Sequence, residues 1–206
     1  MKVNFFQYGR RAIGHDTLQN EPIKRTLMNM SRILLGLVGT FGIALNLAAG
    51  DSPALDPNLE PLRPWLEKTW KGQFKDSKPD KPQVDVVRWE RALNGKAVRI
   101  LHSLNDGAYG GEAIVRWDEA KQAVTYDYFT TASFTTKGTM SIKDGKIITR
   151  EVVSGSAGGI TEVRAEFEMR GDGTYHVKTE YLKDGAWSPG REVTYRQDAT
   201  AKVVFK

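Results

Sequence analysis

Turn signals recur at short intervals from residue 94 onward, and they constrain the fold more than any other feature of the chain. They are Asn94-Gly95, Asp106-Gly107, Asp144-Gly145, Gly171-Asp172-Gly173 and Asp184-Gly185. Between them, apolar and polar residues alternate with period two, and no stretch has a 3.6-residue period long enough for a substantial helix. The chain therefore belongs to the all-β class.

About ten strands follow from this pattern. Short loops join each strand to the next, so the strands pair in sequence order as an antiparallel up-and-down meander. A meander of this length closes into a barrel, because closure removes the exposed strand edges. The expected strands are 69–76, 84–93, 96–104, 110–117, 122–130, 133–142, 146–154, 160–170, 174–182 and 186–196.

The hairpin around Gly171-Asp172-Gly173 shows how the pairing can be checked. A three-residue loop places Met169 opposite Tyr175 on an apolar face, and it places Glu166 opposite Lys178 on a charged face. A slip of one residue would destroy both patterns, so this register is strongly specified.

The Asn94-Gly95 hairpin identifies interior residues of the preceding and following strands. It pairs Trp89 with Ile100, and these apolar side chains must face the core. Alternation then turns Arg91 and His102 inward as well. Arg91 lies close to the turn, however, and its long side chain can also reach the rim.

Two further hairpins add candidates. The loop 118–121 pairs Ala113 with Tyr126, which places Tyr126 and Tyr128 in the interior. A three-residue loop over 143–145 turns Arg150 inward, whereas a two-residue loop would turn Glu151 inward instead; we favour Arg150.

A barrel with large aromatic walls and small residues between them is suited to enclosing a ligand cavity. We therefore expect it to bind a small apolar or amphipathic ligand, with an inward cation anchoring an anionic head group. One alternative is a filled barrel that acts on other proteins; another is a small enzyme using the cavity. The expected cavity wall comprises Trp89, Arg91, Ile100, His102, Trp117, Tyr126, Tyr128 and Arg150.

Several kinds of chemistry lack support in the sequence. The motifs GxSxG and HExxH and the P-loop are missing, so no catalytic residue is assigned. The chain has no Cys and only three His, so we expect no metal site. Residues 1–50 carry six basic and two acidic side chains, which leaves +1 of the total charge of +5 for the remainder. That near-neutral body argues against nucleic-acid binding.

Residues 1–50 have the features of a leader with a signal peptide. An uncharged apolar segment over 33–47 follows Arg25 and Arg32, and Ala48-Ala49-Gly50 ends it with small residues. We expect cleavage after Gly50, a periplasmic or secreted product and no stable membrane span after processing. An uncleaved anchor is the alternative, but the segment is short for a membrane-spanning helix. Residues 51–64 are expected to be an extended Pro-rich linker, with the barrel over 65–206.

Two segments resemble known families. PLRPWLEKTWKG, residues 61–72, looks like the opening of bacterial lipocalin-like families and of nitrobindin-type haem proteins. The stretch from Val87 to Val98 looks like the second and third strands of a secreted lipocalin-like domain of unknown function. The resemblance extends in pattern over 61–197 and implies a ten-stranded calycin-like barrel without a settled activity.

The resemblance does not imply a cofactor. Nitrobindin-type proteins ligate haem iron through a His near the C-terminal strands, and no His follows His176 in this chain. We therefore expect no cofactor, with haem bound through the inward His102 as a minor alternative.

Overall fold

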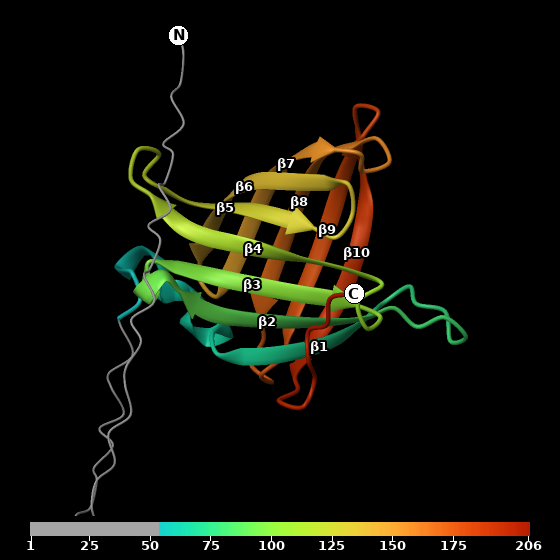
Figure 1. Ribbon diagram of the computed structural model, residues 1–206, viewed down its shortest axis with the longest axis horizontal. Coiled ribbons are helices and arrows are strands. Elements are labelled where there is room, and N and C mark those ends of the chain that lie inside the picture. Colours follow the sequence, from blue (N-terminus) through green and yellow to red (C-terminus); the bar gives the residue numbers. More distant parts are fainter. Residues whose placement is uncertain (1–53) are drawn as a thin grey trace, which may run out of the picture. The chain divides into compact units, whose positions relative to one another are not determined.

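The computed structural model describes residues 54–206, so the expected signal peptide and its cleavage site lie outside the described residues. Within 54–206, ten antiparallel strands form one closed barrel in which each strand pairs with its neighbours in sequence and β1 pairs with β10 (Figure 1). The expected all-β, ten-stranded up-and-down barrel is confirmed. The strands are β1 Lys68–Phe74, β2 Val84–Ala92, β3 Ala97–Leu104, β4 Tyr109–Asp118, β5 Ala123–Thr130, β6 Phe134–Lys143, β7 Lys146–Gly155, β8 Ile160–Met169, β9 Tyr175–Lys183 and β10 Ala186–Gln197.

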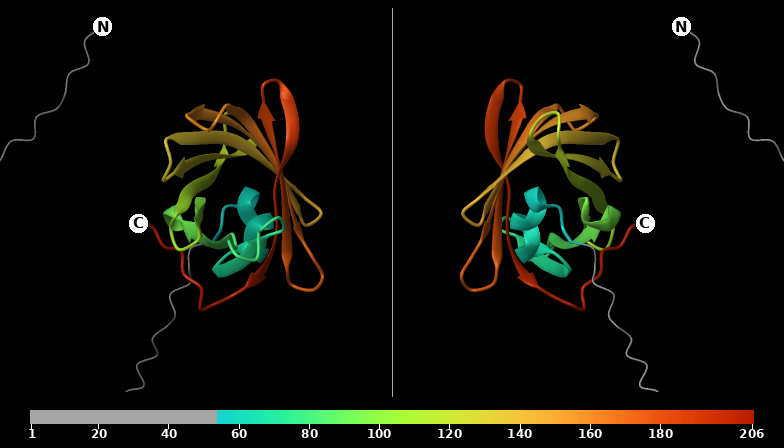
Figure 2. Two further views of the ribbon diagram at one scale, coloured as in Figure 1. Left: turned by 90° about the vertical axis from the view of Figure 1, so that its right-hand side faces the viewer. Right: turned by 90° about the vertical axis from the view of Figure 1, so that its left-hand side faces the viewer.

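A 3₁₀ helix, η1 (Pro57–Trp65), covers one end of the barrel (Figure 2). Its residues Leu59, Leu62 and Trp65 are spaced by three, so a 3₁₀ helix places them on one face, and all three are buried. This corrects the expectation of an extended linker over 51–64, since the described part of that segment is packed on the barrel. Burial of the apolar face outweighs the tendency of the prolines toward an extended chain.

The aromatic core lies where η1 meets the barrel. The rings of Trp65 and Trp89 are 6.1 Å apart. Tyr175 stacks on Tyr195 at 4.6 Å and meets the ring of Trp70 edge-on at 4.9 Å. All five side chains are almost completely buried, so this end of the barrel is filled.

The register of the β8–β9 hairpin is confirmed, with Met169 opposite Tyr175. The register of β2 and β3 is also confirmed, with Trp89 opposite Ile100. Their connection contains a 3₁₀ turn, η2 (Leu93–Gly95).

Two hairpins differ from expectation. Ala113 pairs with Tyr128 instead of Tyr126, because the four-residue β4–β5 loop lies one position further along the chain than expected, with Asp118 opposite Ala123. This shift of two residues keeps both tyrosines facing inward, since side chains alternate with period two. Between β6 and β7 the loop has two residues, with Asp144 at φ 54° and Gly145 at φ 73°. That shift of one residue reverses the faces of β7.

Candidate ligand-binding pocket

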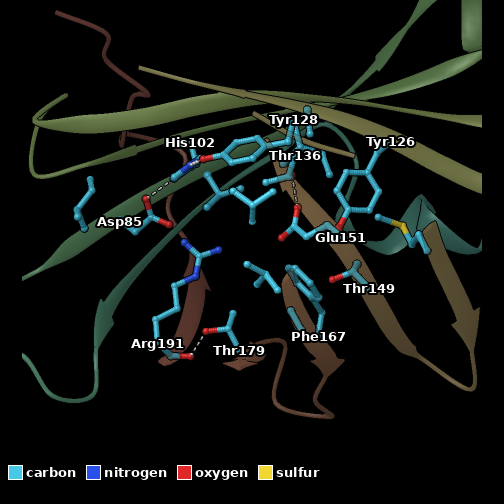
Figure 3. Close-up of a pocket in the computed structure, with 18 of the residues that line it drawn as sticks. Asp85, His102, Tyr126, Tyr128, Thr136, Thr149, Glu151, Phe167, Thr179 and Arg191 are labelled. Carbon is cyan, nitrogen blue, oxygen red and sulfur yellow. Dashed lines mark hydrogen bonds and ion pairs between the residues drawn. The ribbon is translucent and has the colours of Figure 1, made fainter. Parts of the chain in front are cut away.

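The barrel encloses a pocket with a volume of about 360 Å³ (Figure 3). Its floor lies next to η1 and is apolar. Trp89, which is 1% exposed, forms part of the floor together with Met140 and Phe167. The Phe167 ring meets Trp89 edge-on at a centroid distance of 6.4 Å. Such a floor accommodates hydrocarbon and offers little to a charged group.

The opposite end of the pocket is lined by less buried side chains. Phe74, Tyr109, Phe134 and Ile160 are half-buried there, in contrast to the buried Trp89 and Met140 of the floor. Tyr109 and Phe134 stack with nearly parallel rings at 6.4 Å. We therefore place the entrance at this end, away from η1.

A band of polar side chains crosses the pocket between floor and entrance. His102 Nδ1 lies 3.0 Å from Asp85 Oδ1, and His102 Nε2 lies 2.6 Å from the Tyr128 hydroxyl. The hydroxyls of Tyr128 and Tyr109 are 2.9 Å apart. Four polar groups from four strands thus form one continuous hydrogen-bonded chain.

Glycine at position 111 allows this chain to form. A Cβ at Gly111 would collide with the Tyr128 ring and lie 2.7 Å from its hydroxyl. Because that atom is missing, the Tyr128 ring lies close to β4. Its hydroxyl can then reach from β5 across β4 to His102 on β3. Burial raises the pKa of the Tyr128 hydroxyl well above its ordinary value, so Tyr128 is protonated at neutral pH.

Glu151 lies on another wall of the pocket. Thr136 donates its hydroxyl hydrogen to Glu151 Oε2 in a short contact. Burial raises the pKa of the Glu151 carboxyl, although Thr136, the charge of Arg191 and the Tyr126 hydroxyl act in the opposite direction. The pocket therefore holds a carboxyl group that resists ionisation.

Arg191 supplies a cation to the pocket from a β-bulge. The register of β10 against β9 shifts between Pro189 and Glu192, and Thr179 Oγ1 donates to the Arg191 carbonyl at 3.1 Å. Figure 3 shows the guanidinium pointing into the pocket. Within residues 54–206, no carboxylate lies within ion-pair distance of this guanidinium and no hydrogen bond holds it.

Arg191 keeps its positive charge although its guanidinium is buried in the pocket. Burial acts to lower the pKa of the guanidinium, but the neighbouring Tyr195, Asp85, Tyr181 and Tyr128 more than offset this, and the pKa is raised. A guanidinium is in any case always protonated in proteins. The pocket thus contains a permanent positive charge whose guanidinium donors have no hydrogen-bond acceptor among residues 54–206.

Five of the eight expected wall residues line the pocket: Trp89, Ile100, His102, Tyr126 and Tyr128. Their role in binding stays a prediction. Arg91 lies outside the pocket, with its Nε 3.5 Å from Glu67 Oε1. Trp117 lies near the end of β4, where its indole Nε1 donates to Glu119 Oε2 at 2.6 Å.

Arg150 is on the outer surface, which corrects its expected inward orientation. Its side chain is 69% exposed and lies 2.8 Å from Glu162 Oε2. The two-residue β6–β7 turn, with both residues in the left-handed region, shifts β7 by one position, so Glu151 faces the pocket instead.

Asp85 and Arg191 are pocket residues that the sequence analysis missed. The signal was present, because Asp85 shares the parity of Val87 and Trp89 on β2. Arg191 likewise shares the parity of Val193 and Tyr195 on β10. Side-chain alternation continued along both strands would have placed both inside.

The geometry of His102 does not fit haem ligation. Both ring nitrogens already have hydrogen-bond partners, so neither is free to bind iron from the pocket. Within the described part of the chain, no group of three His, Cys, Asp or Glu side chains could hold a metal ion. The same residues contain no helix long and apolar enough to cross a membrane.

Comparisons with known proteins support the fold. The sequence matches no protein-family model, and no curated protein matches it significantly. The crystal structure of Rv2717c from M. tuberculosis is similar, with a TM-score of 0.53 and 15% sequence identity. The match covers 70% of this chain and 99% of that one. At this identity the similarity shows a shared barrel fold and nothing about function.

Proposed function

We propose that this barrel binds a small amphipathic organic anion. The head group lies at Arg191, and the apolar part extends toward the floor at Trp89 and Phe167. The observation that carries the proposal is the Arg191 guanidinium, which points into a largely apolar pocket without a carboxylate at ion-pair distance among residues 54–206.

Electrostatics favour an anion as the missing partner. A charge removed from water is costly unless it is paired and hydrogen-bonded. The Asp85 carboxylate is already engaged by His102 and Tyr195, and Glu151 is held by Thr136. A bound carboxylate would therefore complete the hydrogen bonding of Arg191 in a planar, two-point arrangement.

The floor supports an apolar tail on the same ligand. Its lining side chains are hydrocarbon or aromatic, and burial of apolar surface there contributes about 25 cal/mol per Å². The presence of a pocket favours a binding barrel over a filled barrel that acts through its surface. Together with the apolar segment over 33–47, we propose that binding takes place in the periplasm or after secretion.

The test compares octanoate with 1-octanol by isothermal titration calorimetry on wild type, Arg191→Met and Arg150→Met. Arg191→Met should weaken octanoate binding by about 10- to 150-fold, the equivalent of about 1.5–3 kcal/mol for a hydrogen bond to a charged group. It should change octanol binding far less. Arg150 is the matched control, because it is an exposed arginine on the outer face.

Equal binding of octanoate by wild type and Arg191→Met would overturn the proposal. Failure of wild type to bind octanoate or octanol would overturn it as well. In that case the interaction-barrel alternative would gain support.

A further inference from the structure

The chain of hydrogen bonds through His102 has a direction that depends on the charge of His102. Asp85 Oδ1 lies 3.0 Å from Nδ1, and an ionised carboxylate can only accept, so Nδ1 carries a hydrogen. In the neutral imidazole, Nε2 must then accept from the Tyr128 hydroxyl at 2.6 Å. Tyr128 in turn accepts from Tyr109 at 2.9 Å. Tyr109 uses its only hydroxyl hydrogen in this bond, so its oxygen presents lone pairs to the pocket.

One proton on His102 reverses this order. A charged imidazole donates from Nε2 to the Tyr128 oxygen, so the Tyr128 hydrogen turns to the Tyr109 oxygen. The Tyr109 hydrogen is then released toward the pocket. Asp85, which is 1% exposed and adjacent to the ring, offsets the cost of the charge.

Tyr109 is suited to be the end of this chain. It lines the pocket on the side of the entrance and is half-buried. Burial raises the pKa of its hydroxyl, so Tyr109 keeps its hydrogen at neutral pH, and the positive charge of Arg191 acts on the same hydroxyl. Arg191 and Tyr109 line the same pocket, so a head group held by Arg191 has the Tyr109 hydroxyl on a neighbouring wall.

We propose that Tyr109 is a second contact for the ligand head group and that His102 sets whether it donates or accepts, so that the barrel takes up an organic anion together with a proton. The inference rests on the proposed function and specifies the ligand chemistry further. An anion requires a donor at Tyr109, and the charged form of His102 provides one without breaking the hydrogen bond between Tyr109 and Tyr128. An alcohol can donate its hydroxyl hydrogen to the Tyr109 oxygen, which accepts when His102 is neutral. An alcohol therefore binds without proton uptake.

Other titratable groups face the same chain and define the controls. Asp85 and Tyr195 lie on β2 and β10, and the Tyr195 hydroxyl donates to Asp85 Oδ2 at 2.7 Å. Arg191 faces it from β10, and Tyr109 and Tyr128 belong to β4 and β5. Glu151 on β7 is the competing proton acceptor, because its carboxyl also resists ionisation. Variants at Glu151 and His102 therefore separate the two sites of protonation.

The experiment measures proton uptake during binding of octanesulfonate, which stays ionised and cannot carry the proton itself. Titration calorimetry in buffers of different ionisation enthalpy, between pH 6 and 9, gives the number of protons bound. Wild type should show uptake that peaks above about half a proton, as expected for a coupling of about tenfold. His102→Gln and Tyr128→Phe should show almost none. Glu151→Gln should retain the wild-type value.

The outcomes separate this inference from the proposed function. Sulfonate binding by wild type without proton uptake would overturn the inference alone. Uptake that persists in both His102→Gln and Tyr128→Phe, or that disappears in Glu151→Gln, would also overturn it. Tyr128→Phe preserves the ring and decides the question should His102→Gln fail to fold. Absence of anion binding to wild type would instead overturn the proposed function.

Discussion

Tyr195 donates its hydroxyl hydrogen to Asp85 at 2.7 Å, although the two residues are 110 positions apart in the chain. Gly72 on β1 lies between them and pairs with both. A Cβ at Gly72 would lie 2.6 Å from Val193 and 2.9 Å from the Tyr195 ring. The missing side chain therefore lets Tyr195 reach across β1, where the first and last strands close the barrel.

Removal of this hydroxyl should destabilise the barrel. We expect Tyr195→Phe to reduce the free energy of unfolding by about 1–3 kcal/mol, because a buried carboxylate loses a donor. Urea unfolding followed by circular dichroism measures the change. Tyr181→Phe is the control, since within residues 54–206 the Tyr181 hydroxyl has no hydrogen-bond partner. Equal effects of the two substitutions would refute the role of the Asp85 contact.

Glu151 should make stability depend on pH. Its folded-state pKa lies above the ordinary value of 4.5, so the folded protein binds more protons than the unfolded chain just above that pH. Stability contributed by the neutral carboxyl is present below about pH 4.5 and lost as the pH rises through the folded pKa. Relative to wild type, Glu151→Gln should therefore gain free energy of unfolding as the pH rises from about 4.5 through the folded pKa.

A carboxyl with the opposite shift provides the control for that measurement. Hydrogen bonding to Arg164 lowers the pKa of the exposed Glu180. Glu180→Gln should lose a little stability relative to wild type as the pH rises toward about 4.5, and it should then run parallel to wild type, because folded wild-type Glu180 ionises below the ordinary pKa. Parallel pH profiles for Glu151→Gln and Glu180→Gln would contradict the assignment.

The barrel could be predicted because its strands are specified by local information. Alternation and turn residues fix where each strand begins and which face is apolar, and errors of two residues leave the faces unchanged. The β4–β5 register is such an error, since Tyr126 and Tyr128 still face the pocket. A one-residue error at a turn reverses which face of the following strand points inward. At the β6–β7 turn, this error placed Arg150 in the pocket, where the structure has Glu151.

The pocket chemistry was harder to predict because its key groups depend on contacts distant in sequence. Alternation along β10 places Arg191 inside, but only the pairing with β9 shows that it lies in a β-bulge opposite Thr179. The pairing of His102 with Asp85 and Tyr128 requires three strands to be in register. The sequence placed His102 inside but could not identify its partners.

The packing of η1 on the barrel leads to a prediction about stability. Leu62 is completely buried, so Leu62→Ala should reduce the free energy of unfolding by about 2–5 kcal/mol through lost burial and a residual cavity. Leu93 is 70% exposed, and Leu93→Ala should change it by less than about 0.5 kcal/mol. Chemical unfolding measures both. A negligible effect of Leu62→Ala would show that η1 does not stabilise the barrel.

Processing of the leader is tested on the full chain expressed in a secreting bacterial host. Cleavage after Gly50 predicts a mature protein that begins at Asp51. N-terminal sequencing of the soluble exported fraction checks this directly. Recovery of the intact segment 33–47 in the membrane fraction would favour the uncleaved anchor.

Tryptophan emission should report occupation of the pocket, because one of the five tryptophans forms its floor. Trp89 is 1% exposed and contacts Phe167, so an apolar ligand above it changes the surroundings of its ring. Octanoate and 1-octanol should both shift or quench the emission, and Trp89→Phe should remove most of that change. Trp187 lies outside the pocket beneath the Arg164 guanidinium, at 4.4 Å from ring centroid to charge, and Trp187→Phe should leave the response unchanged. A response that survives Trp89→Phe and disappears with Trp187→Phe would place the ligand on the outer surface, where Arg191 cannot reach it.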